Sequence, residues 1–339
     1  MTSDKKPAPN GWIILDKPRG LGSTQAVSAV KRNLREGGYA KTKVGHGGTL
    51  DPLAEGVLPI ALGEATKLAG RMLDASKIYE FTVQFGVETE TLDTEGEVVE
   101  RSDVRPTLAK IEAVLPQFTG AIEQVPPAYS ALKVDGKRAY DLARAGEAVE
   151  LKARAVTIHA LNILPEPGRW QREALTEGHD GADAPLHQPA AGSPPRIGED
   201  MGEVTLQAHV SKGTYIRSLA RDIARALGTC GHVTYLRRSK AGPFIEAQAI
   251  SLDKLNEIAN GAQLSDLLLP LEAGLDDIPA LSLSQTDVQA LQQGRVVSGL
   301  PQSSGLYCAM LDTRPIALVE IREGTAKVVR GFNLPDVAE

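Results

Sequence analysis

The sequence predicts an α+β fold with a small, β-rich domain at its C-terminal end. Segments typical of strands and of helices follow one another without the regular strand–helix–strand rhythm of a doubly wound sheet. From about Leu275 onward the pattern changes to short strands separated by turns. We therefore expect one domain over residues 1–274 and a second over residues 275–339.

The first part of the chain mixes strand and helix signals. GWIILDKPRG is typical of a strand that runs into a Pro-Gly turn. Ser23 and Thr24 are candidate N-caps of a helix through QAVSAVKRNLRE, which Gly37 and Gly38 end. We expect further helices over EATKLAGRMLDA and TLAKIEAVLPQF, and a strand over KIYEFTVQFGV.

The second part begins with two predicted strands, RAVTIHALNIL and GEVTLQAHVS, and a helix over TYIRSLARDIARALG. Gly228 is placed to close that helix at its C′ position. Residues 165–202, between the two strands, are rich in Pro, Gly, Ala and Asp, so we expect a flexible acidic insertion there. The strands of the C-terminal domain are expected over YCAMLD, RPIALVEIRE and TAKVVRGFN.

The composition is ordinary for a soluble globular protein, with 42% hydrophobic and 24% charged residues. No apolar run approaches the ~20 residues of a membrane span, and the first residues lack the apolar core of a signal peptide, so we expect a cytoplasmic protein. The two cysteines, Cys230 and Cys308, exclude a disulfide framework and a cysteine-based zinc site. The histidines show no His-Glu-x-x-His spacing, so metal catalysis has no support.

The net charge of −6 is unevenly distributed. Residues 1–50 carry nine lysines and arginines against three acids, and residues 210–244 carry seven against one. Because salt screens charges over roughly 8–10 Å, two basic segments that meet in space could bind a polyanion on an acidic protein. For each segment alone, an ordinary solvated surface is the alternative.

A turn rich in glycine and proline, GHGGTLDPLAEGVLP, contains a single carboxylate, Asp51. It lacks the Gly-Lys-Ser/Thr of a phosphate-binding loop, and no Gly-x-Ser-x-Gly elbow accompanies it as in a hydrolase. In the simplest reading Asp51 bonds its own backbone in an Asp-Pro turn. However, Pro52 pushes Asp51 toward an extended conformation, and the apolar residues that follow predict a partly desolvated support. A carboxylate held there next to a cation can act as a nucleophile or base.

That turn belongs to a series of segments that together resemble a known family. GHGGTLDPLAEGVLPIALGEATK is accompanied by GWIILDKPRGLGST, KIYEFTVQFGVETETLDTEGEV, QVPPAYSALKVDGKRAYDLARAG, VSKGTYIRSLARDIARALG and HVTYLRRSKAGPF. From Gly11 to Phe244 these segments are similar, in the same order, to the motifs of the bacterial tRNA pseudouridine-55 synthases, the TruB family. Gly47 stands where the family more often has threonine, and Glu55 where a small polar residue is common.

The resemblance implies the pseudouridine synthase fold, a mixed, largely antiparallel central sheet flanked by helices and loops, with a PUA-like C-terminal domain. It implies an enzyme that isomerises uridine 55 in the T-arm loop of tRNA. The N1–C1′ bond breaks, the base rotates, and C5 bonds to C1′. Substrate and product are isomers, so the resemblance implies no cofactor, metal or energy source.

Three residues are catalytic by this resemblance. Asp51 is the nucleophile, or the base that assists glycosidic cleavage. Arg217 keeps Asp51 ionised and oriented through a bidentate pair. Tyr79 stacks on the target base, and its phenol helps to move the C5 proton. By spacing alone, the favoured interpretation of Arg217 is a member of an exposed i, i+4 stripe, and an aromatic at Tyr79 is more often a core residue.

The same resemblance assigns the substrate pocket and the partner. Tyr215 and Leu236 line the pocket, and His46 enters the space left by the extruded uridine. Apolar packing for Leu236 and a turn role for His46 are the alternatives. Lys17 and Lys133 lie in the basic segments expected to hold the tRNA, together with Lys137, Arg138 and Arg144.

The expected partner is the tRNA T-arm stem-loop, with no membrane and no obligate protein partner. A non-catalytic tRNA-binding or tRNA-folding protein would use the same basic surfaces without needing an ionised Asp51. A guide-RNA-dependent relative would keep the chemistry but need partner proteins, whereas the compact C-terminal region favours a protein that acts alone.

Overall fold

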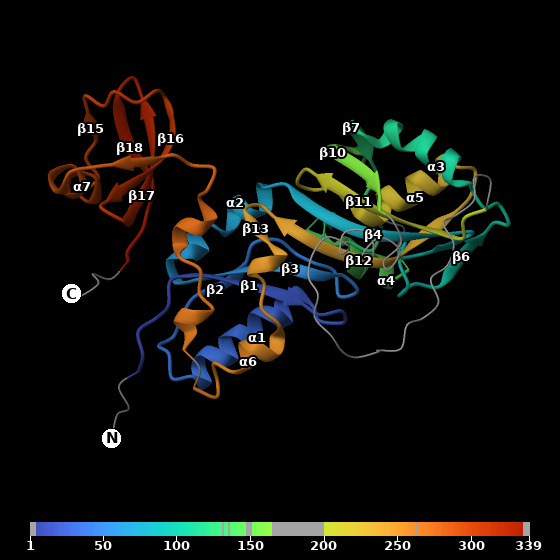
Figure 1. Ribbon diagram of the computed structural model, residues 1–339, viewed down its shortest axis with the longest axis horizontal. Coiled ribbons are helices and arrows are strands. Elements are labelled where there is room, and N and C mark those ends of the chain that lie inside the picture. Colours follow the sequence, from blue (N-terminus) through green and yellow to red (C-terminus); the bar gives the residue numbers. More distant parts are fainter. Residues whose placement is uncertain are drawn as a thin grey trace, which may run out of the picture. The chain divides into compact units, whose positions relative to one another are not determined.

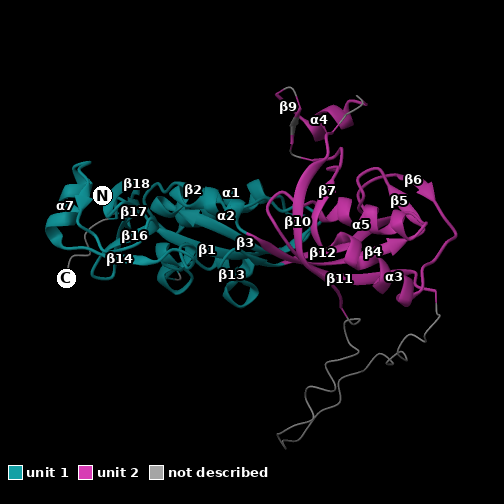
Figure 2. Ribbon diagram, turned by 90° about the horizontal axis from the view of Figure 1, so that it is seen from above, with its two compact units in different colours: residues 1–75, 239–339 teal, residues 76–238 magenta. Residues whose placement is uncertain are grey.

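The computed structural model describes residues 5–130, 132–134, 136–146, 151–164, 200–261 and 263–334 (Figure 1). The chain divides into two compact units (Figure 2), one formed by residues 1–75 with 239–339 and the other by residues 76–238. The expected insertion lies, from residue 165 to residue 199, outside the described residues. No helix in the described part of the chain is long and apolar enough to cross a membrane.

The first unit is built on three antiparallel strands and the long helix α1. Strand β3 (Glu55–Leu62) pairs along its length with β1 (Gly11–Lys17) and at its far end with β2 (Val44–His46). Every residue of β3 after Glu55 is buried. Helix α1 (Ser23–Glu36) confirms the predicted helix; it buries Ala26, Val27, Val30 and Leu34 on one face, and Gly37 ends it.

The EATKLAGRMLDA segment differs from the single helix that the sequence predicts. The 3-10 helix η1 (Gly63–Lys67) is followed at Leu68 by the short helix α2 (Ala69–Asp74). Thr66 donates its hydroxyl to the carbonyl oxygen of Gly63 at 2.7 Å. Such a side-chain bond to the backbone competes with regular helical bonding, which accounts for the break.

The second unit holds an antiparallel sheet in the order β4-β11-β10-β7. Its strands are β4 (Lys77–Phe85), β11 (Glu203–Val210), β10 (Arg154–Ile163) and β7 (Gly120–Gln124). The sequence predicted β4, β10 and β11, and the structure confirms them. Smaller hairpins are formed by β5 (Val87–Thr89) with β6 (Val98–Arg101), and by β8 (Lys133–Val134) with β9 (Lys137–Arg138).

The main helix of the second unit is α5 (Ile216–Ala226), and Gly228, at φ 74°, follows it as predicted. Helix α3 (Leu108–Val114) turns into the 3-10 helix η2 (Leu115–Phe118), whose Pro116 lacks the N–H that a longer α-helix would use. The remaining elements before the C-terminal sheet are α4 (Ala139–Arg144), β12 (Gly231–Ala241), β13 (Phe244–Ile245), η3 (Glu246–Gln248), α6 (Leu252–Asn256), η4 (Leu264–Asp266) and η5 (Leu271–Gly274).

The C-terminal segment forms a five-stranded sheet in the order β14-β16-β17-β18-β15, with β14 parallel to β16 and the other pairs antiparallel. Its core contains Ala309, Val319 and Ile321, all fully buried. The observed architecture is therefore α+β with a β-rich C-terminal part, as predicted. The elements are β14 (Ala280–Ser282), α7 (Gln285–Gln292), β15 (Val297–Ser298), β16 (Gly305–Leu311), β17 (Arg314–Arg322) and β18 (Thr325–Gly331).

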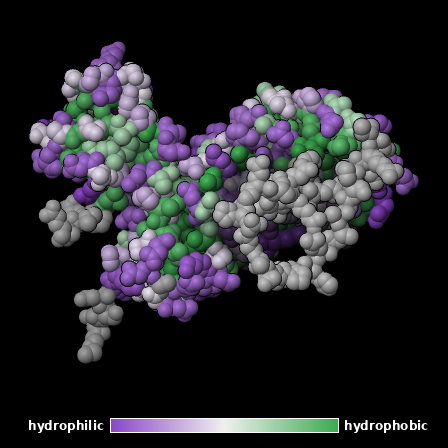
Figure 3. Space-filling model, viewed as in Figure 1, coloured by the Kyte–Doolittle hydropathy of each residue, from purple (hydrophilic) through white to green (hydrophobic). Residues whose placement is uncertain are grey.

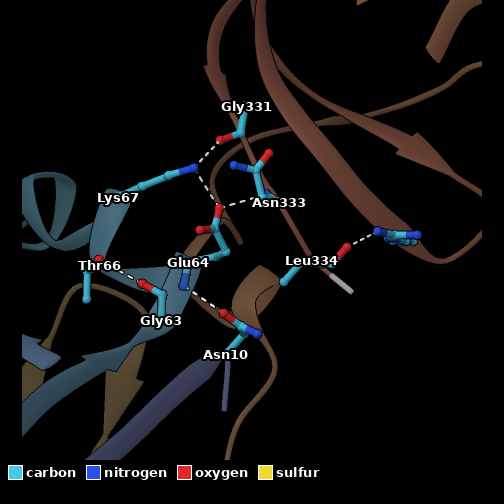
Figure 4. A network of polar contacts seen from close by, with 9 residues as sticks. Asn10, Gly63, Glu64, Thr66, Lys67, Gly331, Asn333 and Leu334 are labelled. Atoms are coloured by element: carbon cyan, nitrogen blue, oxygen red, sulfur yellow. Dashed lines mark hydrogen bonds and ion pairs between the residues drawn. The ribbon is translucent and has the colours of Figure 1, made fainter. Parts of the chain in front are cut away.

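Within the first unit the C-terminal sheet is joined to the N-terminal strands by an apolar cluster and a polar network. Trp12 and Met72 share a buried cluster with Leu318 and Phe332. In the network (Figure 4), Lys67 donates to Glu64 at 2.6 Å and to the carbonyl of Gly331 at 2.8 Å, and the N–H of Asn333 donates to Glu64 at 2.7 Å.

Burial by itself raises the pKa of the Glu64 carboxyl. The hydrogen bonds from Lys67 and Asn333 and the charges of Lys67 and Lys43 outweigh that effect, so the pKa lies below its ordinary value. Glu64 is therefore held in its charged form, the form that the network needs.

Candidate active site

Asp51 lies in the loop that connects β2 to β3, beside the C-terminal end of β1. Strands β2 and β3 pair with His46 opposite Ile60, and Lys17 at the end of β1 pairs with Gly56 at the start of β3. The loop is therefore closed at its base by paired strands on both sides. Asp51 is half-buried, whereas Leu50 and Leu53 around it are buried. The apolar neighbours anchor the loop and leave the carboxylate accessible.

Ser23 fixes the aspartate loop through two reciprocal hydrogen bonds with Leu50. Its hydroxyl donates to the Leu50 carbonyl at 2.9 Å and accepts from the Leu50 N–H at 2.8 Å. The prediction that Ser23 or Thr24 caps α1 is wrong: the N-cap is Gly22, and the Gln25 side chain accepts from the Gly22 N–H. The Ser23 hydroxyl is engaged with the aspartate loop instead, which ties the start of α1 to the residue before Asp51.

Lys17 ties the same loop to the turn that follows β1. Its side chain is fully buried, and its ammonium donates to the carbonyls of Leu21 at 2.7 Å, Pro18 at 3.0 Å and Pro52 at 3.4 Å. The N–H of Gly20, a residue with φ 86°, also donates to the Pro52 carbonyl, at 2.7 Å. Lys17 was predicted to bind RNA, but its ammonium is turned inward and contacts the carbonyl of Pro52, the residue that follows Asp51.

His46 and Gly47 form the other side of the loop. The Nδ1 atom of His46 accepts from the Gly48 N–H at 3.4 Å, and the Gly47 N–H donates to the Pro59 carbonyl at 2.8 Å. A Cβ atom on Gly47 would lie 2.6 Å from the Cβ of Met72, so a threonine does not fit there unless Met72 moves. This close approach explains why the chain has glycine where the family more often has threonine.

Arg217, near the start of α5, is held in a buried ion pair with Asp93. Its Nη1 lies 3.3 Å from Asp93 Oδ2 and donates to the Thr91 carbonyl at 2.8 Å, while Nη2 donates to the Tyr129 carbonyl at 3.0 Å. The Arg217 and Asp93 side chains are only 5% and 3% exposed, so their charges depend on these contacts. Burial raises the pKa of the Tyr129 phenol, and the hydrogen bond to Glu90 and the negative charge of Glu90 raise it further.

The loop that carries Asp93 is fixed in turn by its own hydrogen bonds. The other Asp93 carboxylate oxygen accepts from the Thr91 hydroxyl at 2.5 Å and from the Glu95 N–H at 2.9 Å. Leu92, at φ 62°, is a non-glycine residue in the left-handed region, and its carbonyl accepts from the Val233 N–H at 3.0 Å. Such a conformation persists only where surrounding contacts enforce it, so this loop is a rigid support for Arg217.

Tyr79 lies on β4, half-buried, next to the buried Arg238 of β12. The Arg238 Nη1 lies 3.5 Å from the Tyr79 hydroxyl, and its guanidinium carbon lies 6.0 Å from the ring centroid. Arg238 is 1% exposed and therefore brings a desolvated positive charge to the phenol. Leu236, two residues earlier on β12, is buried.

Tyr215 is the N-cap residue of α5, two positions before Arg217. Its ring is half-buried and lies against Arg154, whose guanidinium carbon is 4.7 Å from the ring centroid. Lys133 belongs to β8, and its side chain lies outside the described residues.

The structure thus places the expected residues in two groups. Lys17, His46 and Asp51 belong to the first unit, and Tyr79, Tyr215, Arg217 and Leu236 belong to the second. The pairing of Arg217 with Asp51 stays a prediction. Sequence reasoning missed Ser23 as a support of the aspartate loop, and it missed Asp93 and Arg238 altogether, although Asp93 stands in the quoted TLDTEG segment.

The fold resembles that of several solved structures. The protein aligns with a chain of a structure described as "H/ACA RNP bound to a substrate RNA containing 2′-deoxyuridine", at a TM-score of 0.65 and 23% identity, covering 96% of this chain and 86% of that chain. It aligns with a chain of an archaeal box H/ACA sRNP Nop10-Cbf5 complex at a TM-score of 0.64 and 24% identity, covering 96% and 87%. At this identity the likeness shows the fold.

The sequence matches the models of a known protein family and is similar to named relatives along its length. Residues 35–175 match the model of the N-terminal domain of TruB family pseudouridylate synthases, and residues 217–276 match that of the C-terminal domain of tRNA pseudouridylate synthase B. The protein is 63% identical to the tRNA pseudouridine synthase B of Novosphingobium aromaticivorans, over 97% of this chain and 99% of the relative. It is 52% identical to that of Zymomonas mobilis, over 98% and 99%. The chain belongs to the TruB family of pseudouridylate synthases.

Proposed function

We propose that this protein is a cytoplasmic tRNA pseudouridine-55 synthase in which Asp51 is the nucleophile. The reaction breaks the N1–C1′ bond of uridine 55, rotates the base and forms a C5–C1′ bond. The C5 proton is lost and N1 gains one, so the product is an isomer of the substrate. Membership of the TruB family supports the reaction class, and the half-buried Asp51 on its fixed loop is the observation that carries the assignment.

The loop geometry suits a nucleophilic carboxylate. Ser23 and Lys17 hold the residues on either side of Asp51 through backbone carbonyl and N–H groups. A reacting group placed in this way loses little freedom on the way to the transition state, because its position is set before the substrate arrives. The target uridine is flipped out of the T-loop to reach it, at a cost of a few kcal/mol.

Tyr79 and Arg238 suit the handling of the extruded base. The half-buried ring of Tyr79 offers a stacking surface, and its hydroxyl, which lies beside the Arg238 guanidinium, is placed to take part in the proton transfer from C5. In this proposal Tyr215 and Leu236 line the pocket for the base, and His46 enters the space that the uridine leaves in the T-loop.

Exposed cations supply the grip on the tRNA backbone. On α1 the exposed stripe carries Lys31, Arg32 and Arg35, and hydrophilic residues gather on the surface (Figure 3) over the part of the first unit where Figure 1 labels α1 and α6. Exposed Lys137, Arg138 and Arg144 stand on β9 and α4 of the second unit. Phosphate contacts of this kind give affinity without reading sequence. The protein acts without an obligate protein partner in this proposal.

The test maps the modified position. Purified protein without added cofactor is incubated with an unmodified tRNA transcript, and pseudouridine is located at nucleotide resolution. We expect a single modified site at position 55, none in a matched transcript with cytidine there, and none with Asp51→Asn. Modification at another uridine would contradict the site assignment, and full activity of Asp51→Asn would contradict the catalytic one.

A further inference from the structure

Tyr215 is held at two points, its backbone and its ring, by residues that stand directly opposite each other in the sheet. Gln124 is the last residue of β7 and Arg154 the first of β10, and the two are register partners. Gln124 Oε1 accepts from the Tyr215 N–H at 2.8 Å, and Gln124 Nε2 donates to the Tyr215 carbonyl at 3.1 Å. Arg154 lies over the Tyr215 ring and donates to the carbonyl of Gly213.

The buried side-chain amide of Gln124 bonds the backbone of Tyr215. Its side chain is 1% exposed, and both of its polar atoms bond the same residue, in the way that two strands exchange N–H and C=O bonds. An N-cap residue sets where the helix starts, so the amide also fixes the first turn of α5, which carries Arg217.

The chain that leaves Gln124 is attached to α5 as well. The carbonyl of Val125 accepts from the Ser218 hydroxyl at 2.8 Å and from Arg221 Nη2 at 3.1 Å. The carbonyl of Tyr129 accepts from Arg217. Two buried prolines, Pro126 and Pro127, restrict the backbone between these points. Residues 124–129 therefore form a stiff strap along the start of α5.

We propose that Gln124 and Arg154 are positioning residues, which hold Tyr215 and the first turn of α5, and with it Arg217, in the geometry needed for pseudouridine formation. This role rests on the proposed function. Neither side chain touches the reacting atoms in the proposal. Their loss should therefore slow the chemical step at bound substrate rather than weaken tRNA binding.

The experiment measures the single-turnover rate of pseudouridine formation at saturating tRNA, together with the Kd for tRNA and the melting temperature. Gln124→Met keeps the length of the side chain and removes both hydrogen bonds, whereas Gln124→Glu keeps an oxygen for the Tyr215 N–H. We expect Gln124→Met to lower the rate by about 10- to 100-fold, because small displacements of positioned groups have effects of this size. Gln124→Glu should lie between it and wild type, and the Kd should change by less than about 3-fold.

Gln207→Met is the matched control. Gln207 stands on strand β11, next to β10, and its Nε2 donates to the Glu80 carboxylate at 3.4 Å. Its rate should equal that of wild type. If the Gln124 variants fail to fold, Arg154→Lys tests the proposal instead. This substitution keeps the charge but removes the planar guanidinium that stacks on Tyr215 and its fork of donors. We expect a slower rate at an unchanged Kd.

The proposal is overturned by a wild-type rate in Gln124→Met, by an equal loss in Gln207→Met, or by a loss that appears entirely in Kd. If wild-type protein and the control form no pseudouridine at all, the proposed function itself has failed, and this role fails with it.

Discussion

The aspartate loop of the first unit, which connects β2 to β3, and the buried contacts of Arg217 in the second unit, here called the arginine clamp, are both rigid. They are held by different means. Asp51 is half-buried, and the hydrogen bonds that fix its loop run between backbone groups and the side chains of Ser23 and Lys17. Arg217 is almost completely buried, and its own guanidinium contacts Asp93 and two carbonyls. The loop supports its carboxylate through the main chain, whereas the clamp engages the charged group itself.

This difference predicts how each region responds to mutation. Losing one support of the aspartate loop leaves other backbone contacts in place, so the effect should be partial. Losing Asp93 removes the buried carboxylate that is paired with the Arg217 guanidinium, which costs far more.

Asp51→Asn should lower turnover by on the order of 10⁴-fold or more, the scale seen when an essential nucleophile is removed. The amide has nearly the same shape as the carboxylate, and Ser23 and Lys17 hold the loop through backbone groups of Leu50 and Pro52, which the substitution leaves in place. Folding and tRNA affinity should therefore stay close to wild type, as thermal melts and filter binding would show.

Asp93→Asn should destabilise the protein by about 3–5 kcal/mol, because it removes one partner of a buried ion pair. Denaturant unfolding measures this loss. As a matched control, Asp277→Asn removes an exposed partner of Arg71, and pairs of that kind contribute about 0–1 kcal/mol. Equal effects of the two substitutions would contradict the assignment of Asp93 as the buried counter-charge of Arg217.

Lys17→Met should destabilise the protein by about 1–3 kcal/mol, since the carbonyls of Leu21 and Pro18 lose a donor in a buried site. Turnover should fall, but less than in Asp51→Asn, because Ser23 and the Gly20 N–H still hold the loop. If Lys17→Met binds tRNA more weakly while folding and turnover at saturation are unchanged, Lys17 contacts RNA directly, as the sequence analysis expected.

Replacing Lys31, Arg32 and Arg35 of α1 together by alanine should weaken tRNA binding and reduce the slope of log K against log salt. Each lost phosphate contact should reduce that slope by about 0.7–0.9. Turnover at saturating tRNA should be unchanged, since none of the three contacts the aspartate loop in the described hydrogen bonds. Lys110→Ala, on the exposed face of α3, is the control, and an equal change in its salt slope would argue against a dedicated surface on α1.

Glu64→Gln should lower the melting temperature by a few degrees at neutral pH, by loosening the contact with Lys67 and Asn333. The pKa of Glu64 is lowered in the folded protein, so its stabilising contribution is present above the unfolded-state value near 4.5 and is lost as the pH falls through the folded-state value. The difference between wild type and Glu64→Gln should therefore shrink below about pH 4. A difference that grows with acidity would contradict this account.

The sequence predicted the periodic elements well and the supports of the site poorly. The strands β1, β4, β10 and β11 and the helices α1 and α5 follow from alternation, helical spacing and terminal glycines, which are local properties. The choice of Gly22 over Ser23 as the cap of α1 was missed, because the competing partner of Ser23 is Leu50, 27 residues away. Local signals carry no information about such a partner.

The same limit applies to the charged residues. Asp93 pairs with Arg217 across more than a hundred residues of sequence, and Gln124 meets Tyr215 with a separation of 91. By residue type alone, Asp93 fits a turn and Gln124 fits the end of a strand. Asp51 could be singled out because an unusual local context, between two glycines and a proline, surrounds it. Supports that depend on long-range contacts required the structure.

The most direct test of the central assignment is a single turnover on bound substrate. A tRNA transcript tritiated at C5 of uridine is bound to saturation by wild-type protein and by Asp51→Asn, and tritium release is followed over time. We predict release of one tritium per tRNA with wild type and none with Asp51→Asn, at equal amounts of bound tRNA. Release by Asp51→Asn at the wild-type rate would contradict the assignment of Asp51 as the catalytic carboxylate.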